Sequence, residues 1–145
     1  MAYFAVARSL LSGEAPALPT VMTPAPAGLE AARVAALRGH RVTLFEREGE
    51  TGGWLRVGCL PPHKEEIRTL AKSLTARARK AGAVIRLHHA ADPQSLAAEK
   101  PDVIVLAVGA APLIPPIPGI DAPHVVSAEE ILTGQKAVHG SVVVI

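Results

Sequence analysis

The stretch from Thr23 to Glu46 combines residue types that suit a phosphate group and a ribose. A Gly-rich turn between a strand and a helix lets backbone N–H groups meet phosphate oxygens, in the pattern G-x-G-x-x-G. The three glycine positions of this pattern fall on Thr23, Ala25 and Gly28, so the third glycine alone is present. Glu46 ends the strand pattern that follows the helix, where a carboxylate can accept both hydroxyls of an adenosine ribose.

The two lost glycines weaken the phosphate turn, whereas the following helix favours it. Thr23 is β-branched and disfavours a positive φ, Pro24 lacks an N–H donor, and the Ala25 methyl takes space near a phosphate oxygen. The helix that Pro26 and Ala27 begin still offers free N–H groups and a positive dipole end to an anion. Two interpretations therefore stay open: a nucleotide site, or a decayed one with a surface carboxylate.

Strand and helix patterns alternate along the chain and predict the elements that would position these residues. The alternation predicts an α/β, Rossmann-like fold, with a mostly parallel sheet and helices on both faces. The nearly wholly apolar strand at 102–107 is typical of a strand covered on both faces. The predicted strands are 20–22, 41–46, 83–88, 102–107 and 141–145, and the predicted helices are 26–39, 64–81, 92–99 and 127–134.

Composition limits the class of protein and its surroundings. The 145 residues, 49% of them hydrophobic, indicate one folded domain at 20–145 after an extension or linker at 1–19. A single cysteine forms no internal disulfide and favours a reducing compartment, which we take to be the cytoplasm. No apolar run approaches the roughly 18 residues of a membrane span. The basic run at 77–80 favours a solvent-exposed helix face over a surface that binds nucleic acid.

Several motifs, in order and with similar spacing, resemble one family of flavoproteins. They are Pro26-Ala-Gly-Leu-Glu30, Phe45-Glu46, Thr51-Gly-Gly-Trp-Leu-Arg56, Leu60-Pro-Pro-His-Lys-Glu-Glu-Ile67, Lys100-Pro-Asp-Val-Ile-Val-Leu-Ala-Val-Gly-Ala110 and Pro112-Leu-Ile-Pro-Pro-Ile-Pro-Gly-Ile120. The chain resembles, over about 21–145, the FAD-binding half-domain of NADH:flavin oxidoreductases of the 2,4-dienoyl-CoA reductase and trimethylamine dehydrogenase type. That family is part of the wider pyridine nucleotide-disulfide oxidoreductase-like superfamily.

The resemblance implies a role for each matching position. The turn from Thr23 to Gly28 would face the FAD pyrophosphate, Glu46 would hold the adenosine ribose, and Ala91 would meet adenine through its backbone. Gly53, Trp54 and Arg56 would line the pyrophosphate and ribitol, and the segment 108–110 stands where the family often has Thr-Gly-Ala. The cofactor-binding residues implied in this way are Thr23, Ala25, Pro26, Ala27, Gly28, Glu46, Arg47, Gly53, Trp54, Arg56, Ala91, Val108 and Gly109.

The family's other parts have no counterpart in the sequence. The resemblance implies a flavin barrel, an iron–sulfur cluster and an NAD(P)H-binding half, and the run 142–145 would be the first strand of that half. We therefore expect a truncated domain with no catalytic residue, which binds the ADP moiety of FAD weakly and self-associates or joins the missing oxidoreductase domains. The alternatives are a non-binding structural or interaction remnant, and a subunit completed by a separately encoded partner.

Cys59 and the histidines suggest two further chemistries, neither of which we expect. The segment around Cys59 resembles the redox segment of disulfide reductases. Disulfide exchange within that segment needs a second thiol, and Cys59 is the only cysteine in the sequence. Cys59 with His63, or His88 with His89, could begin a metal site, but neither pair has a matching second pair. We predict no metal site and no disulfide chemistry.

The weakened turn yields a prediction. Thr23→Gly combined with Ala25→Gly should strengthen ADP binding, measured by calorimetric titration against the parent chain. Removing the Ala25 methyl lets phosphate oxygens reach backbone N–H groups, and such charge-assisted bonds contribute about 1.5–3 kcal/mol each. Pro24 still denies one donor, so the gain should be partial. A double variant that binds ADP no better than the parent would show that the lost glycines do not limit affinity.

Overall fold

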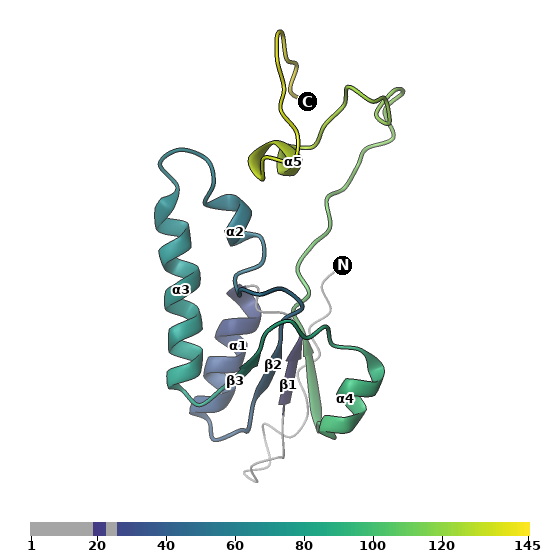
Figure 1. The fold of residues 1–145 in the computed structure, drawn as a ribbon. Helices are drawn as coiled ribbons and strands as arrows, with labels where there is room; N and C mark the ends of the chain where they lie inside the picture. The colour runs from purple at the N-terminus through teal and green to yellow at the C-terminus, as the bar shows by residue number, and fades with distance from the viewer. Residues whose placement is uncertain (1–18, 23–25) are drawn as a thin grey trace.

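The chain forms a four-stranded sheet with helices packed around it (Figure 1). The computed structural model describes residues 19–22 and 26–145. The sheet order is β3-β2-β1-β4, and all three strand pairs are parallel. The elements are β1 (Pro19–Met22), α1 (Pro26–Leu37), β2 (Thr43–Phe45), α2 (Leu55–Gly58), α3 (Glu65–Lys80), β3 (Val84–Arg86), α4 (Pro93–Glu99), β4 (Val103–Leu106) and α5 (Ala128–Leu132).

The strand order reverses at β1, and this fixes where a ligand site can form. The chain moves outward from β1 to β2 and β3, then returns to place β4 on the other side of β1. The register pairs Val21 with Leu44 in β2 and with Val105 in β4. Because every pair is parallel, the carboxyl ends of all four strands meet at one edge, and ligands of open α/β sheets bind outside that edge at the reversal.

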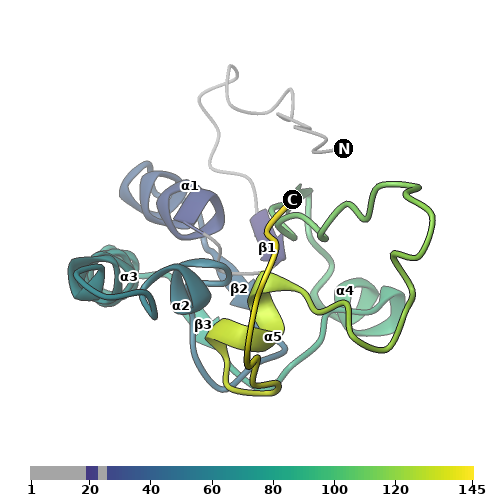
Figure 2. The ribbon, with the colours of Figure 1, turned by 90° about the horizontal axis from the view of Figure 1, so that it is seen from above.

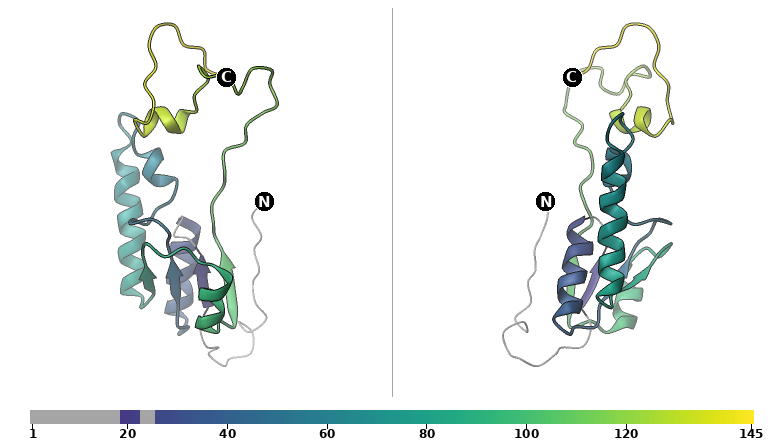
Figure 3. Two further views of the ribbon diagram at one scale, coloured as in Figure 1. Left: turned by 45° about the vertical axis from the view of Figure 1, so that its right-hand side comes forward. Right: turned by 90° about the vertical axis from the view of Figure 1, so that its left-hand side faces the viewer.

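Helices cover both faces of the sheet. Seen from above, α1 and α3 lie on one side of the strands and α4 lies on the other (Figure 2). This confirms the predicted α/β, Rossmann-like architecture. The chain after β4 leaves the sheet as an extended segment that leads to α5, on the carboxyl side of the strands (Figure 3).

The core lies between the sheet and the α1–α3 layer, and small side chains build most of it. Leu44 of β2 and Leu29 of α1 are wholly buried there, with Val42 just before the strand. Alanines at the helix contact, such as Ala32 of α1 and Ala78 of α3, let the two helices approach closely. The opposite face of β2 carries Phe45 and Thr43, because neighbouring strand residues alternate between faces.

Helix ends follow the local signals that the sequence carries. Pro26 begins α1, as proline suits a first helical turn. The Asp92 carboxylate accepts hydrogen bonds from the N–H groups of Gln94 and Ser95 and so begins α4. The hydrogen bond from the Ser95 N–H is the main cause that lowers the pKa of the Asp92 carboxyl group, and the bond from the Gln94 N–H lowers it further. Ser127 and Glu130 form a capping box at the start of α5, within the helix predicted at 127–134.

Two strand predictions differ from the structure, one at 141–145 and one at β4. Residues 141–145 form no strand, Val143, Val144 and Ile145 are exposed, and the C-terminal end of the chain lies away from the sheet (Figure 1). An apolar run becomes a strand only where a neighbouring strand offers hydrogen bonds, and this run reaches none. The strand β4 exists, but it is an edge strand with half-buried residues rather than one covered on both faces. The short helix α2 was not among the predicted elements.

The wholly buried position of Leu44 allows a stability prediction. Leu44→Ala should lower the free energy of unfolding by about 2–5 kcal/mol, because the central strand cannot close the cavity that the change leaves. Urea unfolding followed by circular dichroism measures this. Leu37→Ala, on the exposed side of α1, is the matched control and should change stability by less than about 0.5 kcal/mol. Equal losses in both variants would show that the core does not lie where Leu44 is.

Candidate nucleotide-binding edge

Three described segments meet at the carboxyl edge of the sheet, and each contains predicted site residues. The segment after β2 holds Glu46, the segment after β3 leads to Ala91, and the segment after β4 holds Val108 and Gly109. Parallel strands bring all three to the same edge. The turn that contains the predicted residues Thr23 and Ala25 lies outside the described residues.

Glu46 is the most constrained of the predicted residues. Its side chain is buried, with an exposed fraction of 4%, directly after β2. One carboxylate oxygen, Oε1, accepts a hydrogen bond of 2.9 Å from the N–H group of Glu48. The backbone is held by β3 and the segment after it, because the Glu46 N–H donates to the carbonyl of Arg86 and the His89 N–H donates to the carbonyl of Glu46. A buried carboxylate is costly unless it is hydrogen-bonded, so this position is more constrained than a surface charge.

The helix α1 presents the glycine that the phosphate-turn pattern retains. Gly28 is buried in the first turn of α1, next to the wholly buried Leu29. A glycine here allows the helix to pack closely against the strands, the role of the third glycine in the pattern. Pro26 is half-buried and Ala27 is exposed at the helix start. The described part of the site thus keeps the packing and helix components of a dinucleotide unit.

The segment after β3 lies beside Glu46 and fits the predicted adenine side. The His89 ring packs on Phe45, with ring centroids 4.8 Å apart, and its N–H reaches the Glu46 carbonyl. His88 has a positive φ of 53°, and its ring packs against Gly49, where a Cβ atom would lie 2.7 Å from Cε1. Ala91 is half-buried and immediately precedes Asp92, the cap of α4. The segment is therefore held from both ends.

Gly53 and Trp54 connect the segment after β2 with the segment after β4. Gly53 has φ +51°, which places Trp54 at the start of α2. The Trp54 indole N–H donates a hydrogen bond of 2.8 Å to the carbonyl of Ala110. Gly109, with φ +76°, lies so close that an added Cβ would be 3.9 Å from Trp54 Cδ1. The structure therefore brings these predicted residues together.

The two predicted arginines are exposed and engaged with neighbouring carboxylates. Arg47 forms an ion pair of 3.1 Å with Glu48, and Arg56 lies 3.8 Å from a Glu50 oxygen. Both pairs are exposed to solvent and contribute little to stability. The structure does not join them to Glu46, so either arginine would have to leave its partner to contact a phosphate.

Thr51 and Thr75 are positioning residues that the sequence analysis missed. Their hydroxyl oxygens lie 2.5 Å apart, and the Thr75 hydroxyl also bonds the carbonyl of Ala71 within α3. Gly52, with φ +116°, packs so closely that a Cβ there would lie 3.1 Å from Ala71 Cβ. These contacts tie the segment after β2 to α3. The clue in the sequence was the pair of glycines beside a threonine, but nothing there identified the partner on α3.

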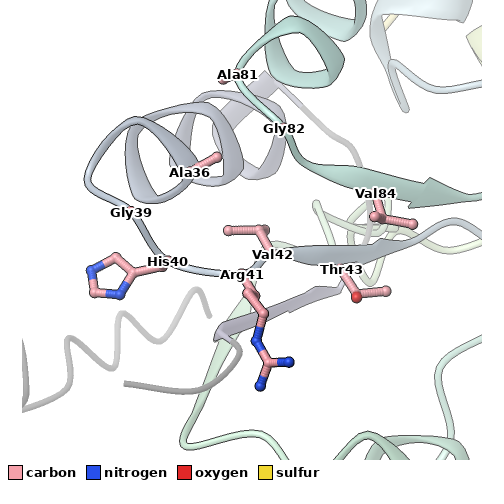
Figure 4. A pocket seen from close by; sticks show the side chains of 9 residues that line it. All are labelled: Ala36, Gly39, His40, Arg41, Val42, Thr43, Ala81, Gly82 and Val84. Carbon is pink, nitrogen blue, oxygen red and sulfur yellow. The ribbon is translucent and has the colours of Figure 1, made fainter. Parts of the chain in front are cut away.

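A shallow hollow lies at the other end of the sheet and contains none of the predicted site residues (Figure 4). It is formed where the chain enters β2 and β3, and the Arg41 and His40 side chains extend from its rim. Ligands of parallel α/β sheets bind at the carboxyl ends of strands, so this hollow is not the nucleotide site. Its lining residues are Ala36, Gly39, His40, Arg41, Val42, Thr43, Ala81, Gly82 and Val84.

Cys59 is buried, and its thiol lies 3.2 Å from the carbonyl oxygen of Arg56.

Within residues 19–22 and 26–145, no three histidine, cysteine, aspartate or glutamate side chains gather as a metal ion would need. None of the helices in this described part of the chain is both long and apolar enough to cross a membrane.

Comparisons with known proteins connect this architecture to flavoproteins. The chain is 42% identical over 119 residues to the bilirubin reductase of Mediterraneibacter gnavus and 40% identical over 119 residues to the cinnamate reductase of Clostridium sporogenes. Each match covers 82% of this chain. Among solved structures, a 2-naphthoyl-CoA reductase complex matches 88% of the chain at 33% identity, with a TM-score of 0.79. No family model matches the chain.

These relatives are much longer than the chain. The chain spans about a fifth of their length, and 19% of the length of the bilirubin reductase. The solved reductase is likewise covered over 19% of its length. The shared part is the same α/β unit, because sequence and structural matches both extend over more than four fifths of this chain. The chain is thus a homologue of the FAD-binding-like C-terminal region of NADH:flavin oxidoreductases of the 2,4-dienoyl-CoA reductase type.

Proposed function

We propose that residues 20–145 form the portion of an NAD(P)H-dependent flavin oxidoreductase that binds the ADP moiety of FAD, with residues 1–19 as an extension outside it. The observation that carries the proposal is the buried Glu46 carboxylate at the carboxyl end of β2. Its Oε1 is held by the Glu48 N–H, which sets the orientation of the group. A carboxylate in this place suits the hydroxyls of an adenosine ribose.

The described residues fit the adenosine end of the cofactor better than its flavin end. Glu46 binds the ribose, the backbone near Ala91 borders the adenine, and the first turn of α1 offers N–H groups to the pyrophosphate. Bound FAD supplies the hydride and electron transfer, while the protein supplies binding and orientation. The chain's own residues therefore hold and orient the nucleotide, and the chain alone does not reduce a substrate.

Two other functions have support from particular observations. The glycine losses at Thr23 and Ala25 favour a structural or interaction module whose nucleotide site has decayed. The exposed apolar side chains of Leu113, Val143 and Val144 favour a unit that self-associates or joins further oxidoreductase domains. Nucleotide titration separates the first alternative from the main proposal, and light scattering tests the second.

Glu46→Gln provides the test of the main proposal. Glutamine keeps the shape of the side chain and an oxygen for the Glu48 N–H, but its NH₂ group cannot accept from a ribose hydroxyl. Hydrogen bonds to charged groups contribute about 1.5–3 kcal/mol, so the Kd for ADP should rise about tenfold to a hundredfold. Calorimetric titration with ADP measures the change, and thermal unfolding checks that the variant is folded.

Two controls make the test specific for the ribose. The exposed carboxylate of Glu48 lies two residues further on, and Glu48→Gln should leave the Kd for ADP unchanged. In the parent chain, 2′-deoxy-ADP should bind more weakly than ADP, whereas Glu46→Gln should bind both alike. If the parent binds no ADP, the decayed-site alternative replaces the proposal. If Glu46→Gln keeps full affinity and full discrimination, Glu46 does not hold the ribose.

A further inference from the structure

Trp54 forms a bridge across the edge at which the nucleotide would bind. Its indole Nε1 donates to the carbonyl of Ala110, a residue 56 positions later in the chain. Trp54 follows β2 and Ala110 follows β4, and these strands lie on opposite sides of β1. The bridge therefore joins two segments whose strands flank β1.

The strand order sets the course of a dinucleotide past this bridge. A ligand with its ribose at Glu46, after β2, and its pyrophosphate at the start of α1, after β1, continues in the direction of β4. The next segment in that direction is the one after β4, which contains Gly109 and Ala110. ADP ends before this segment, whereas the ribitol and flavin of FAD extend toward it.

We propose that the Trp54–Ala110 hydrogen bond is a latch that determines specificity, because it admits ADP-type ligands and must open before the flavin half of FAD can pass. This proposal rests on the proposed ADP-binding function and adds a residue that selects between ligands. The side chain of Trp54 is 42% exposed, so water competes for the hydrogen bond, and the latch opens at small cost. Gly53, with its positive φ, directs the indole toward Gly109.

Two substitutions separate the hydrogen bond from the bulk of the side chain. Trp54→Phe keeps an aromatic ring but has no N–H donor, and Trp54→Ala removes the ring as well. Calorimetry measures Kd for ADP and for FAD in each purified chain, and thermal unfolding confirms that each is folded. Leu113→Ala changes an exposed side chain in the segment after β4 and serves as the matched control.

In the parent, FAD should bind no more tightly than ADP. In Trp54→Phe the Kd for FAD divided by the Kd for ADP should fall about threefold to tenfold, the range of one net hydrogen bond. Trp54→Ala should lower the ratio of the Kd for FAD to the Kd for ADP by at least as much. Leu113→Ala should leave this ratio unchanged. An unchanged FAD-to-ADP ratio in both Trp54 variants, with ADP still bound, overturns the latch alone. Failure of every chain to bind ADP overturns the proposed function and the latch together.

Discussion

The parallel pairing of β1 with β2 on one side and β4 on the other is the constraint on which the described site depends. It places the ends of β2 and β4 on either side of β1, so Glu46 and Ala110 belong to one edge although they are far apart in the sequence. It also leaves β4 as an edge strand, which explains why Val103, Ile104 and Val105 are only half-buried and Leu106 is exposed. A different strand order would keep every local element and remove the site.

The burial of Glu46 is the second physical feature that gives the edge its chemistry. Removing a carboxylate from water costs free energy, and the Glu48 N–H offsets part of that cost at one oxygen. The backbone hydrogen bonds to Arg86 and His89 prevent the residue from moving toward solvent. A ribose that donates to the carboxylate would add further compensation, and this is why a buried acid here points to a ligand more strongly than an exposed one.

The support for the segment after β2 comes from helix α3 rather than from the sheet alone. Thr75 bonds Thr51, and Ala71 leaves room for the backbone of Gly52. The same helix packs against α1, whose first turn would face the phosphate in the proposed site. One layer of small residues thus supports both the segment after β2 and α1, and a bulky residue at Ala71 or Ala78 would disturb both.

Local sequence signals predicted the elements that depend on near neighbours: Pro26 begins α1, Asp92 caps α4, and the alternation of strands and helices indicates a parallel sheet. They also placed Glu46 at the end of β2, because both the strand and its end are local. Tertiary structure alone decided contacts between distant segments. The Trp54–Ala110 bridge and the Thr51–Thr75 pair depend on where β4 and α3 pack. The apolar run 141–145 was mispredicted for the same reason, since a strand requires a partner and composition does not supply one.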